Sequence, residues 1–123
     1  MITEGMTHTS TLTVDETVTA ITMGSGDLPV LATPAMTALM ENAAMLAVAD
    51  HLPEGSTTVG GHIDASHVKP TPTGKTVTAT ATVTRVEGKK IEFQVTAHCG
   101  DVLLGEGKHV RYIVDREKFM SRL

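Results

Sequence analysis

The chain has 123 residues, of which 41% are hydrophobic and 20% charged, a composition typical of one globular domain and not of a disordered or fibrous protein. Its net charge of −4 and its scattered basic residues argue against nucleic acid as a partner. No apolar stretch approaches the ~20 residues that a membrane span needs, because Glu41 and Asn42 interrupt the longest one. Aromatic residues make up only 2% of the chain, so small aliphatic and threonine side chains must form the core.

The compartment is indicated by the cysteine content and by the start of the chain. Cys99 is the single cysteine and can form no disulfide within the chain. Residues 1–5 lack the basic start and apolar stretch of a secretory signal peptide. We therefore expect a cytoplasmic protein. No repeat or linker divides the sequence, so residues 1–123 are expected to form a single domain.

The first third of the chain predicts two weak strands and a helix. The strand candidates cover residues 7–14 and 18–23, and residues 24–29 are expected to form a loop. Residues 35–52 are good helix formers, with Thr33 as the expected N-cap, Pro34 as the first helical residue and Pro53 as the stop. Apolar residues lie on every side of this helix, so we expect other structure to enclose it.

The rest of the chain predicts about four long strands. Residues 56–69 are strand-like and end in the turn 70–74. Between residues 75 and 84 threonine takes every even position, and this period of two predicts one inward face and one threonine-coated face. Val86 breaks the alternation, which indicates a bulge near Arg85 before a hairpin turn at residues 87–90. Alternation resumes over residues 91–99, and a turn at 100–101 leads to a last strand over 102–114.

The strands are expected to form a meander. Gly105 and Gly107 share a face of the last strand and mark a close backbone approach, which the helix alanines would permit. An antiparallel sheet curled round one central helix, an α+β architecture, would cover the apolar helix better than a flat sheet.

Glu41 is the first candidate functional residue. A carboxylate within an apolar helix loses hydration and must find a partner or bind a proton. In a pocket it would be a base or nucleophile with a raised pKa. Alternatively, Glu41 and Asn42 emerge at a gap in the sheet and meet water or a second subunit.

A second candidate group lies in the strand that follows the helix. In an extended strand His62 and Asp64 lie on one face and His67 lies on the other, so three convergent metal ligands would need a break in the strand. We therefore expect no metal site. His67 shares a face with Ile63 and Ala65 and could point at the helix, either as a catalytic imidazole or as a hydrogen-bonded core residue. The histidines at positions 8, 51, 98 and 109 are interpreted as surface or structural residues.

Thr33 also has two interpretations. As an N-cap it would be purely structural. A hydroxyl at a helix start, beside free backbone N–H groups, could also orient a carbonyl or a water.

Taken together, these residues resemble the hotdog-fold thioesterases related to fluoroacetyl-coenzyme A thioesterase. The matching stretches cover residues 30–41, 59–67, 70–74, 86–88, 105–111 and 117–119. The resemblance implies the hotdog fold, an acyl-coenzyme A substrate, and a homodimer with its pockets where the subunits meet. No metal or redox cofactor is implied, because coenzyme A is part of the substrate.

The resemblance also implies roles for individual residues. The catalytic residues of the family fall on Thr33, Glu41 and His67, and its substrate-contacting residues fall on Gly60 and Arg111. The aromatic gate of the fluoroacetyl enzyme is missing. Its positions are occupied by Gly24, Asp27 and Asn42. Selectivity for fluoroacetate is therefore not expected.

The helix constrains the mechanism. Thr33 and Glu41 are eight residues apart, about 12 Å along the helix axis, and cannot hydrogen-bond directly. Either substrate lies between them, or two chains contribute different members, or the helix begins later. We hypothesise that Glu41 acts as base or nucleophile toward the thioester carbonyl while His67 handles the proton and Thr33, with nearby backbone N–H groups, stabilises the oxyanion.

Three alternatives to an acyl-coenzyme A thioesterase are a non-catalytic dimer that binds acyl thioesters or small ligands, a hotdog hydratase and a structural dimer. The loop with an Asp and His pair that is usual in such hydratases is missing from the sequence. A structural dimer would leave Glu41 unexplained.

Overall fold

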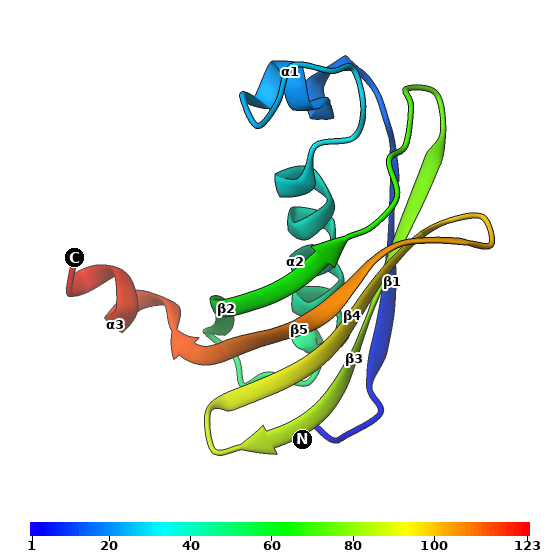
Figure 1. The fold of residues 1–123 in the computed structure, drawn as a ribbon. Helices are drawn as coiled ribbons and strands as arrows, with labels where there is room; N and C mark the ends of the chain where they lie inside the picture. The colour runs from blue at the N-terminus through cyan, green and yellow to red at the C-terminus, as the bar shows by residue number, and fades with distance from the viewer.

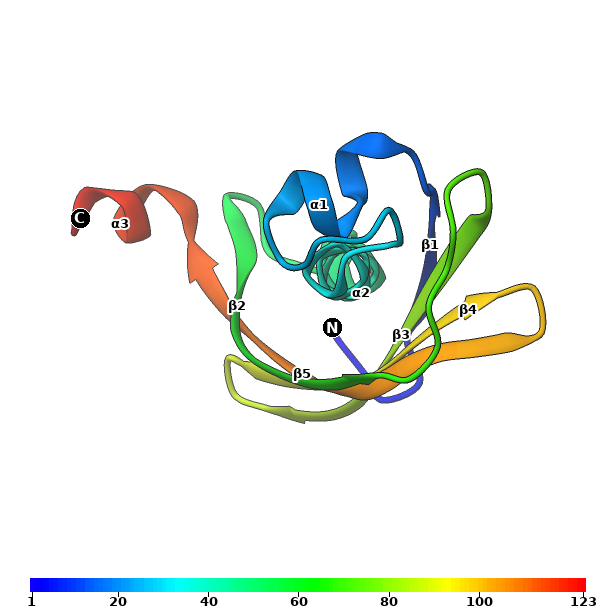
Figure 2. The ribbon, with the colours of Figure 1, turned by 45° about the horizontal axis from the view of Figure 1, so that its top comes forward.

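The computed structural model describes all residues from 1 to 123 and shows a curled sheet with one long helix lying in its hollow (Figures 1 and 2). The strands are β1 (Thr7–Thr13), β2 (Ser56–His67), β3 (Thr76–Glu87), β4 (Lys90–Cys99) and β5 (Val102–Asp115). The helices are η1 (Glu16–Val18), α1 (Ala20–Met23), α2 (Thr33–Ala49) and α3 (Arg116–Ser121). The expected α+β architecture is confirmed.

The order of the strands corrects the expected meander. The five strands lie in the order β1-β3-β4-β5-β2, and all neighbours are antiparallel. β2 pairs with β5 at the far edge, because the segment after it crosses to the other side of the sheet instead of turning tightly. This segment is held on the way by Leu31 N–H, which donates to Thr71 O at 2.8 Å, and by the bridge between Val30 and Pro72.

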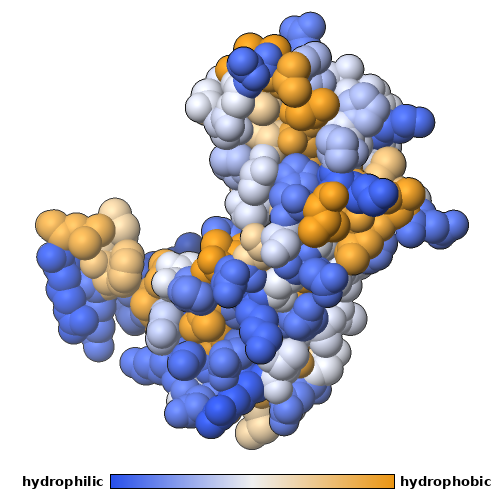
Figure 3. Space-filling model, in the orientation of Figure 1, coloured by the Kyte–Doolittle hydropathy of each residue, from blue (hydrophilic) through white to orange (hydrophobic).

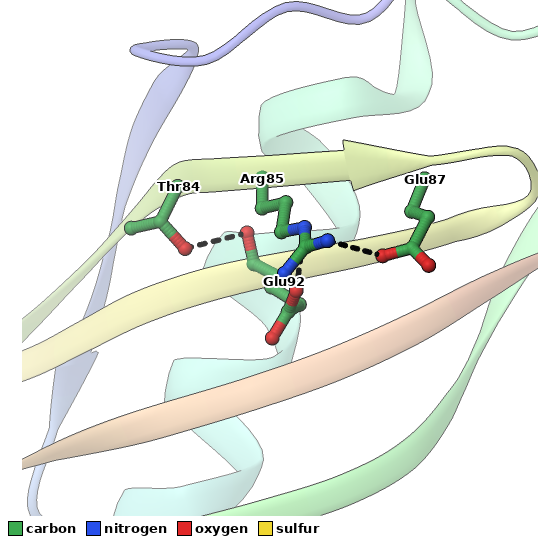
Figure 4. A network of polar contacts seen from close by, with 4 residues as sticks. All are labelled: Thr84, Arg85, Glu87 and Glu92. Atoms are coloured by element: carbon green, nitrogen blue, oxygen red, sulfur yellow. Dashed lines mark hydrogen bonds and ion pairs between the residues drawn. The ribbon is translucent and has the colours of Figure 1, made fainter.

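The alternation in β3 sorts its residues as predicted. The inward residues Val77, Ala79, Ala81 and Val83 are at most 2% exposed. On the outer face, the threonines of β3 stand opposite those of β1, and Thr9 Oγ1 lies 2.8 Å from Thr80 Oγ1. The predicted bulge is also present, since the register shifts between Val83 and Arg85. Beyond it Arg85 contacts Glu87 at 2.9 Å and Glu92 at 3.7 Å on the surface (Figure 4).

Helix α2 packs one face on the sheet. Its buried residues are small or flexible: Ala35, Met36, Met40, Ala43, Ala44, Ala47 and Val48. The opposite face is not enclosed within the single chain, where Leu46 is 41% exposed, so the sheet covers only one side of the helix that we expected other structure to enclose. The core of 20 residues contains a single aromatic ring, that of Phe93.

Thr33 is not the N-cap of α2. That position is held by Ala32, which is extended (φ −70°, ψ 139°) and makes no side-chain capping bond. Its carbonyl accepts the first bonds of the helix, from the N–H groups of Ala35 and Met36. The Thr33 hydroxyl is therefore free for another partner.

The predicted strand over residues 18–23 is also wrong. Thr19 caps the short helix α1 by accepting from Thr22 N–H, and Gly24 ends it with a φ of 75°. The expected loop over residues 24–29 is present.

Apolar surface gathers over the end of the molecule that carries α1 and over α3 (Figure 3).

The glycines of β5 are approached mainly by β2 and not by the helix alanines. A side chain at Gly107 would collide with the backbone of Asp64 and Ala65. A Cβ on Gly105 would lie 2.5 Å from Ser66 O and 2.7 Å from Met36 Sδ. The close approach was predicted correctly, but its main partner is the neighbouring strand.

Candidate active site

Thr33 and His67 form a direct pair. The start of α2 and the end of β2 meet here, and Thr33 Oγ1 lies 2.7 Å from His67 Nδ1. The other ring nitrogen, Nε2, is buried and has no hydrogen-bond partner within the chain. A buried polar atom without a partner is costly, so this nitrogen is a group that a ligand or a second chain would satisfy.

A hollow of about 290 Å³ opens beside this pair. Besides Thr33 and His67, its lining residues are Ala20, Ser25, Val30, Leu31, Val68, Lys69 and Pro70. The loop that contains Gly24 and Asp27 contributes Ser25 to this wall, and both of these residues are exposed. Gly24 and Asp27 themselves do not line the hollow, and Asn42 lines a different one beside Leu39.

A bulge in β2 decides which of its residues face the helix. The pairing with β5 shifts between Gly60 and His62: Gly60 stands opposite Arg111, and Ile63 stands opposite His109. Gly60 and Ile63 consequently face the same side, although they are an odd number of residues apart. The bulge brings the backbone of Gly60 to the same inner face as the side chains of Ile63 and His67.

Glu41 lies over Gly60 together with His109 and Arg111. A methyl group built on Gly60 would lie 3.4 Å from His109 Cε1, 3.5 Å from Arg111 Nη1 and 3.6 Å from Glu41 Oε2. The carboxylate is half-buried and lines a hollow of about 340 Å³ with Gly60, His62 and His109. Glu41 and Arg111 make no ion pair within 4.0 Å and instead face one another across the space above Gly60.

Arg111 is held rigidly. Its side chain is 6% exposed, and Nε donates to Thr58 Oγ1 at 2.8 Å while Nη2 donates to Thr58 O at 2.9 Å. Nη1 lies 3.2 Å from His109 Nε2. Burial lowers the pKa of Arg111, and the carboxylate of Glu41 opposes this shift. An arginine remains charged under such conditions, so the network presents a fixed positive group to Glu41.

The expected site residues thus form two groups in one chain. Thr33 and His67 are together, as are Glu41, Gly60 and Arg111, but no contact joins the two groups. Because α2 begins at Thr33, the possibility of a later helix start is excluded. Glu41 is half-buried, so it is less enclosed than the apolar helix suggested, and it makes no ion pair within the chain. Its neighbour Asn42 is exposed, and its Oδ1 accepts from Ser10 Oγ at 2.7 Å.

The sequence interpretation missed His109 and Thr58 as members of the site. A signal for His109 was available, because a period of two places it on the same face of the strand as Gly107 and Arg111. Thr58 carried no such signal, since its bonds to Arg111 depend on the register between β2 and β5.

The separation of His62 and Asp64 from His67 is as predicted. His67 lies with the inward residues of β2, whereas His62 and Asp64 are exposed.

Nowhere in the chain do three His, Cys, Asp or Glu side chains lie close enough together to hold a metal ion. No helix has the length and apolar character required to cross a membrane.

The chain is similar to thioesterases that act on fluoroacetyl-CoA. The family model described as fluoroacetyl-CoA-specific thioesterase matches residues 14–117. The fluoroacetyl-CoA thioesterase of Streptantibioticus cattleyicolor is 39% identical over 94 residues, which cover 76% of this chain and 68% of that protein.

Solved structures agree with this match. A Thr-to-Ser variant of the fluoroacetyl-CoA thioesterase FlK in complex with acetyl-CoA has a TM-score of 0.93 at 31% identity, covering 98% of this chain and 96% of the other. A thioesterase superfamily member from Thermus thermophilus has a TM-score of 0.89 at 26% identity, covering 99% and 90%.

Proposed function

Because the chain belongs to the fluoroacetyl-CoA-specific thioesterase family, we propose that it hydrolyses an acyl-coenzyme A thioester to a free acid and coenzyme A. The observation that carries the proposal is the space above Gly60, which a carboxylate, a guanidinium and an imidazole border at once. A negative group that can attack or activate water, facing a fixed positive group that can polarise a carbonyl, suits acyl transfer.

Glu41 is the group that acts on the thioester carbonyl. It either attacks the carbonyl carbon itself or removes a proton from a water that does so. If Glu41 attacks, the C–S bond breaks and leaves an acyl anhydride on Glu41, which water then hydrolyses to free the acid and restore the carboxylate. If Glu41 acts as a base, water attacks the carbonyl carbon and the C–S bond breaks directly. In both routes the departing sulfur takes up a proton. Gly60 and Arg111 contact the substrate, with Arg111 Nη1 binding the acyl carbonyl of the bound thioester.

The Thr33 and His67 pair handles the proton and the oxyanion. A threonine hydroxyl 2.7 Å from an imidazole nitrogen can donate or accept according to the protonation of the ring. The unpartnered Nε2 of His67 is the second position at which this imidazole can bind a ligand or a proton.

The active form is a homodimer that joins the two groups of residues. β2 is an edge strand, so its outer backbone groups are free to pair with a second copy. Gly60 lies in the first half of β2, and His67 is its last residue. Antiparallel pairing of two β2 edges therefore brings the Thr33 and His67 end of one subunit beside the Glu41 and Gly60 end of its partner.

The acyl group is not restricted to fluoroacetyl. Gly24, Asp27 and Asn42 carry no aromatic ring that could close over a small fluorinated group. Residues 1–123 act as one domain in the cytoplasm, in agreement with the free thiol of Cys99.

The test is thiol release from a panel of acyl-coenzyme A esters, short to long and including arylacetyl esters. Glu41→Gln should lower kcat/KM by at least about 100-fold, the typical contribution of a general base. Glu54→Gln, which changes an exposed loop carboxylate in the same way, should leave it unchanged.

Two outcomes would contradict the proposal in different ways. Absence of turnover by the parent protein on every ester, together with tight binding of acyl-coenzyme A, would identify a non-catalytic binding protein. Turnover that Glu41→Gln leaves intact would retain the thioesterase but remove Glu41 from its chemistry.

A further inference from the structure

His109 is a buried imidazole that the proposed reaction does not use. It is 1% exposed, and its ring stacks on that of Phe93 with the centroids 6.0 Å apart and the planes at 29°. Nδ1 lies 2.6 Å from the backbone oxygen of His62, and Nε2 lies 3.2 Å from Arg111 Nη1. Both ring nitrogens are thus engaged, one by the bulge of β2 and the other by the guanidinium.

The two contacts determine the tautomer. The carbonyl of His62 can only accept, so Nδ1 donates its proton to that oxygen. Arg111 has donors alone, so Nε2 must accept from Nη1. The neutral ring with its proton on Nδ1 satisfies both contacts, whereas a charged ring would direct an N–H group at another N–H group.

Among the anchors of Arg111, the contact from His109 is the one that holds Nη1. Nε and Nη2 are fixed by Thr58, while Nη1 lies 3.5 Å from the position that a methyl group on Gly60 would take. Because the guanidinium is planar and rigid, Thr58 and the imidazole fix its position together, and the imidazole is the acceptor on the side of Nη1.

We propose that His109 is a positioning residue, whose neutral imidazole aims Nη1 of Arg111 at the acyl carbonyl of the substrate above Gly60. Protonation of His109 places an N–H group opposite Nη1, so the guanidinium loses its acceptor on this side and is repelled from it. The substrate part of the inference rests on the thioesterase function proposed above, but the coupling of His109 to Arg111 does not.

The charged and titratable groups that face His109 act in opposite directions. They are Glu41 on α2, Arg111 on β5 and His62 on β2, while the packed face of β4 contributes only the ring of Phe93. Burial has the largest effect and lowers the pKa of His109, and the charges of Arg111 and of the His62 ring lower it further. The hydrogen bond to His62 O and the charge of Glu41 raise it. The net pKa lies below the ordinary value of 6.5.

The coupling can be tested without turnover by nitrogen-15 NMR of the histidine rings in the intact protein, with the signals of His109 assigned through His109→Gln. The expected result is a neutral ring protonated at Nδ1 at pH 7. Its pKa should rise in Arg111→Met and fall in Glu41→Gln. A ring protonated at Nε2 at pH 7, or a pKa that moves in neither variant, would overturn the proposal.

Kinetics test the positioning role, with the best ester of the panel as substrate. Gln can offer an oxygen near the place of Nε2, so His109→Gln should keep KM within about threefold, whereas His109→Leu should raise KM about tenfold with a smaller change in kcat. In the parent, kcat/KM should fall as the pH drops through the pKa that NMR gives for His109, and His109→Gln should lack this step. An unchanged KM in a folded His109→Leu, or the same acid step in His109→Gln, would refute the role.

Two controls keep the outcomes distinguishable. If His109→Leu fails to fold, judged by circular dichroism, the NMR results and the pH profile of His109→Gln still decide. If the parent hydrolyses no ester, the same variants are compared for binding of acetyl-coenzyme A by calorimetry. His109→Leu should then lose about tenfold in affinity, matching the rise expected in KM, and His109→Gln should lose none.

Discussion

The two groups of candidate site residues are built in different ways. Thr33 and His67 sit at the ends of a helix and a strand and rely on one hydrogen bond of 2.7 Å. Glu41, by contrast, faces Arg111, which is fixed within the sheet by Thr58 and His109. Side chains at the ends of helices and strands can shift at little cost in free energy, whereas side chains inside the sheet are held by closely packed neighbours. We infer that the second group is preorganised in the single chain and that the first is completed by a partner.

The largest expected effect tests whether the active site is shared between two subunits or contained in a single chain. Glu41→Gln and His67→Ala should each lose at least about 100-fold in kcat/KM. When the two variants are refolded together, heterodimers regain one intact site, so that about a quarter of the parental activity should return. Activity that stays at the level of the single variants would place all three catalytic residues in one chain.

Thr33 tests whether the weaker group has a chemical role. Thr33→Val should lower kcat about 100-fold, which is typical for the loss of one group that stabilises an oxyanion. Thr33→Ser should stay within a few-fold. Because Thr33 does not cap α2, Thr33→Val should lower the free energy of unfolding by no more than about 1 kcal/mol, the contribution of its hydrogen bond to His67, and Thr33→Ser by less than about 0.5 kcal/mol. A loss near ~2 kcal/mol on removing the hydroxyl would indicate a cap after all.

Gly60→Ala tests the space between the charged groups. The added methyl group meets its neighbours at 3.4 to 3.6 Å, which is ordinary contact, so chemical denaturation should show little change in stability. The methyl group occupies the place of the acyl carbonyl, and kcat/KM should fall about tenfold, since small displacements of a substrate are costly. Unaltered kinetics would mean that substrate binds elsewhere.

The smallest expected effect concerns stability against pH. The pKa of His109 is lowered in the folded chain, so the unfolded chain takes up the proton first. The stabilisation is complete above about pH 6.5 and is lost as the pH falls through the lowered pKa. In urea titrations His109→Gln should lose less stability on acidification, by at most about 1.4 kcal/mol per pH unit. His51→Gln, at an exposed site, should retain the parental slope.

Local patterns predicted much of the fold. The alternation over residues 75–84, the bulge near Arg85 and the turns at residues 87–90 and 100–101 follow from contacts between near neighbours in the chain. The strand predicted over residues 18–23 failed, because a single capping threonine and Gly24 convert an ambiguous segment into a short helix. The place of β2 at the edge could not be predicted, because it depends on where the crossing segment finds its hydrogen bonds.

The sequence by itself determined the family and the sidedness of its strands, and it supplied the candidate site residues, since these depend on residue identity and on a period of two. Only the tertiary structure decided that Thr33 binds His67 instead of capping α2 and that Glu41 faces a buried guanidinium. It also moved His109 from the presumed surface or structural residues into the site. The physical reason is the register between the strands. A shift of one residue at Gly60 determines which residue of β2 stands opposite Arg111 of β5, and the residue pattern within one strand does not specify how that strand is aligned with its neighbour.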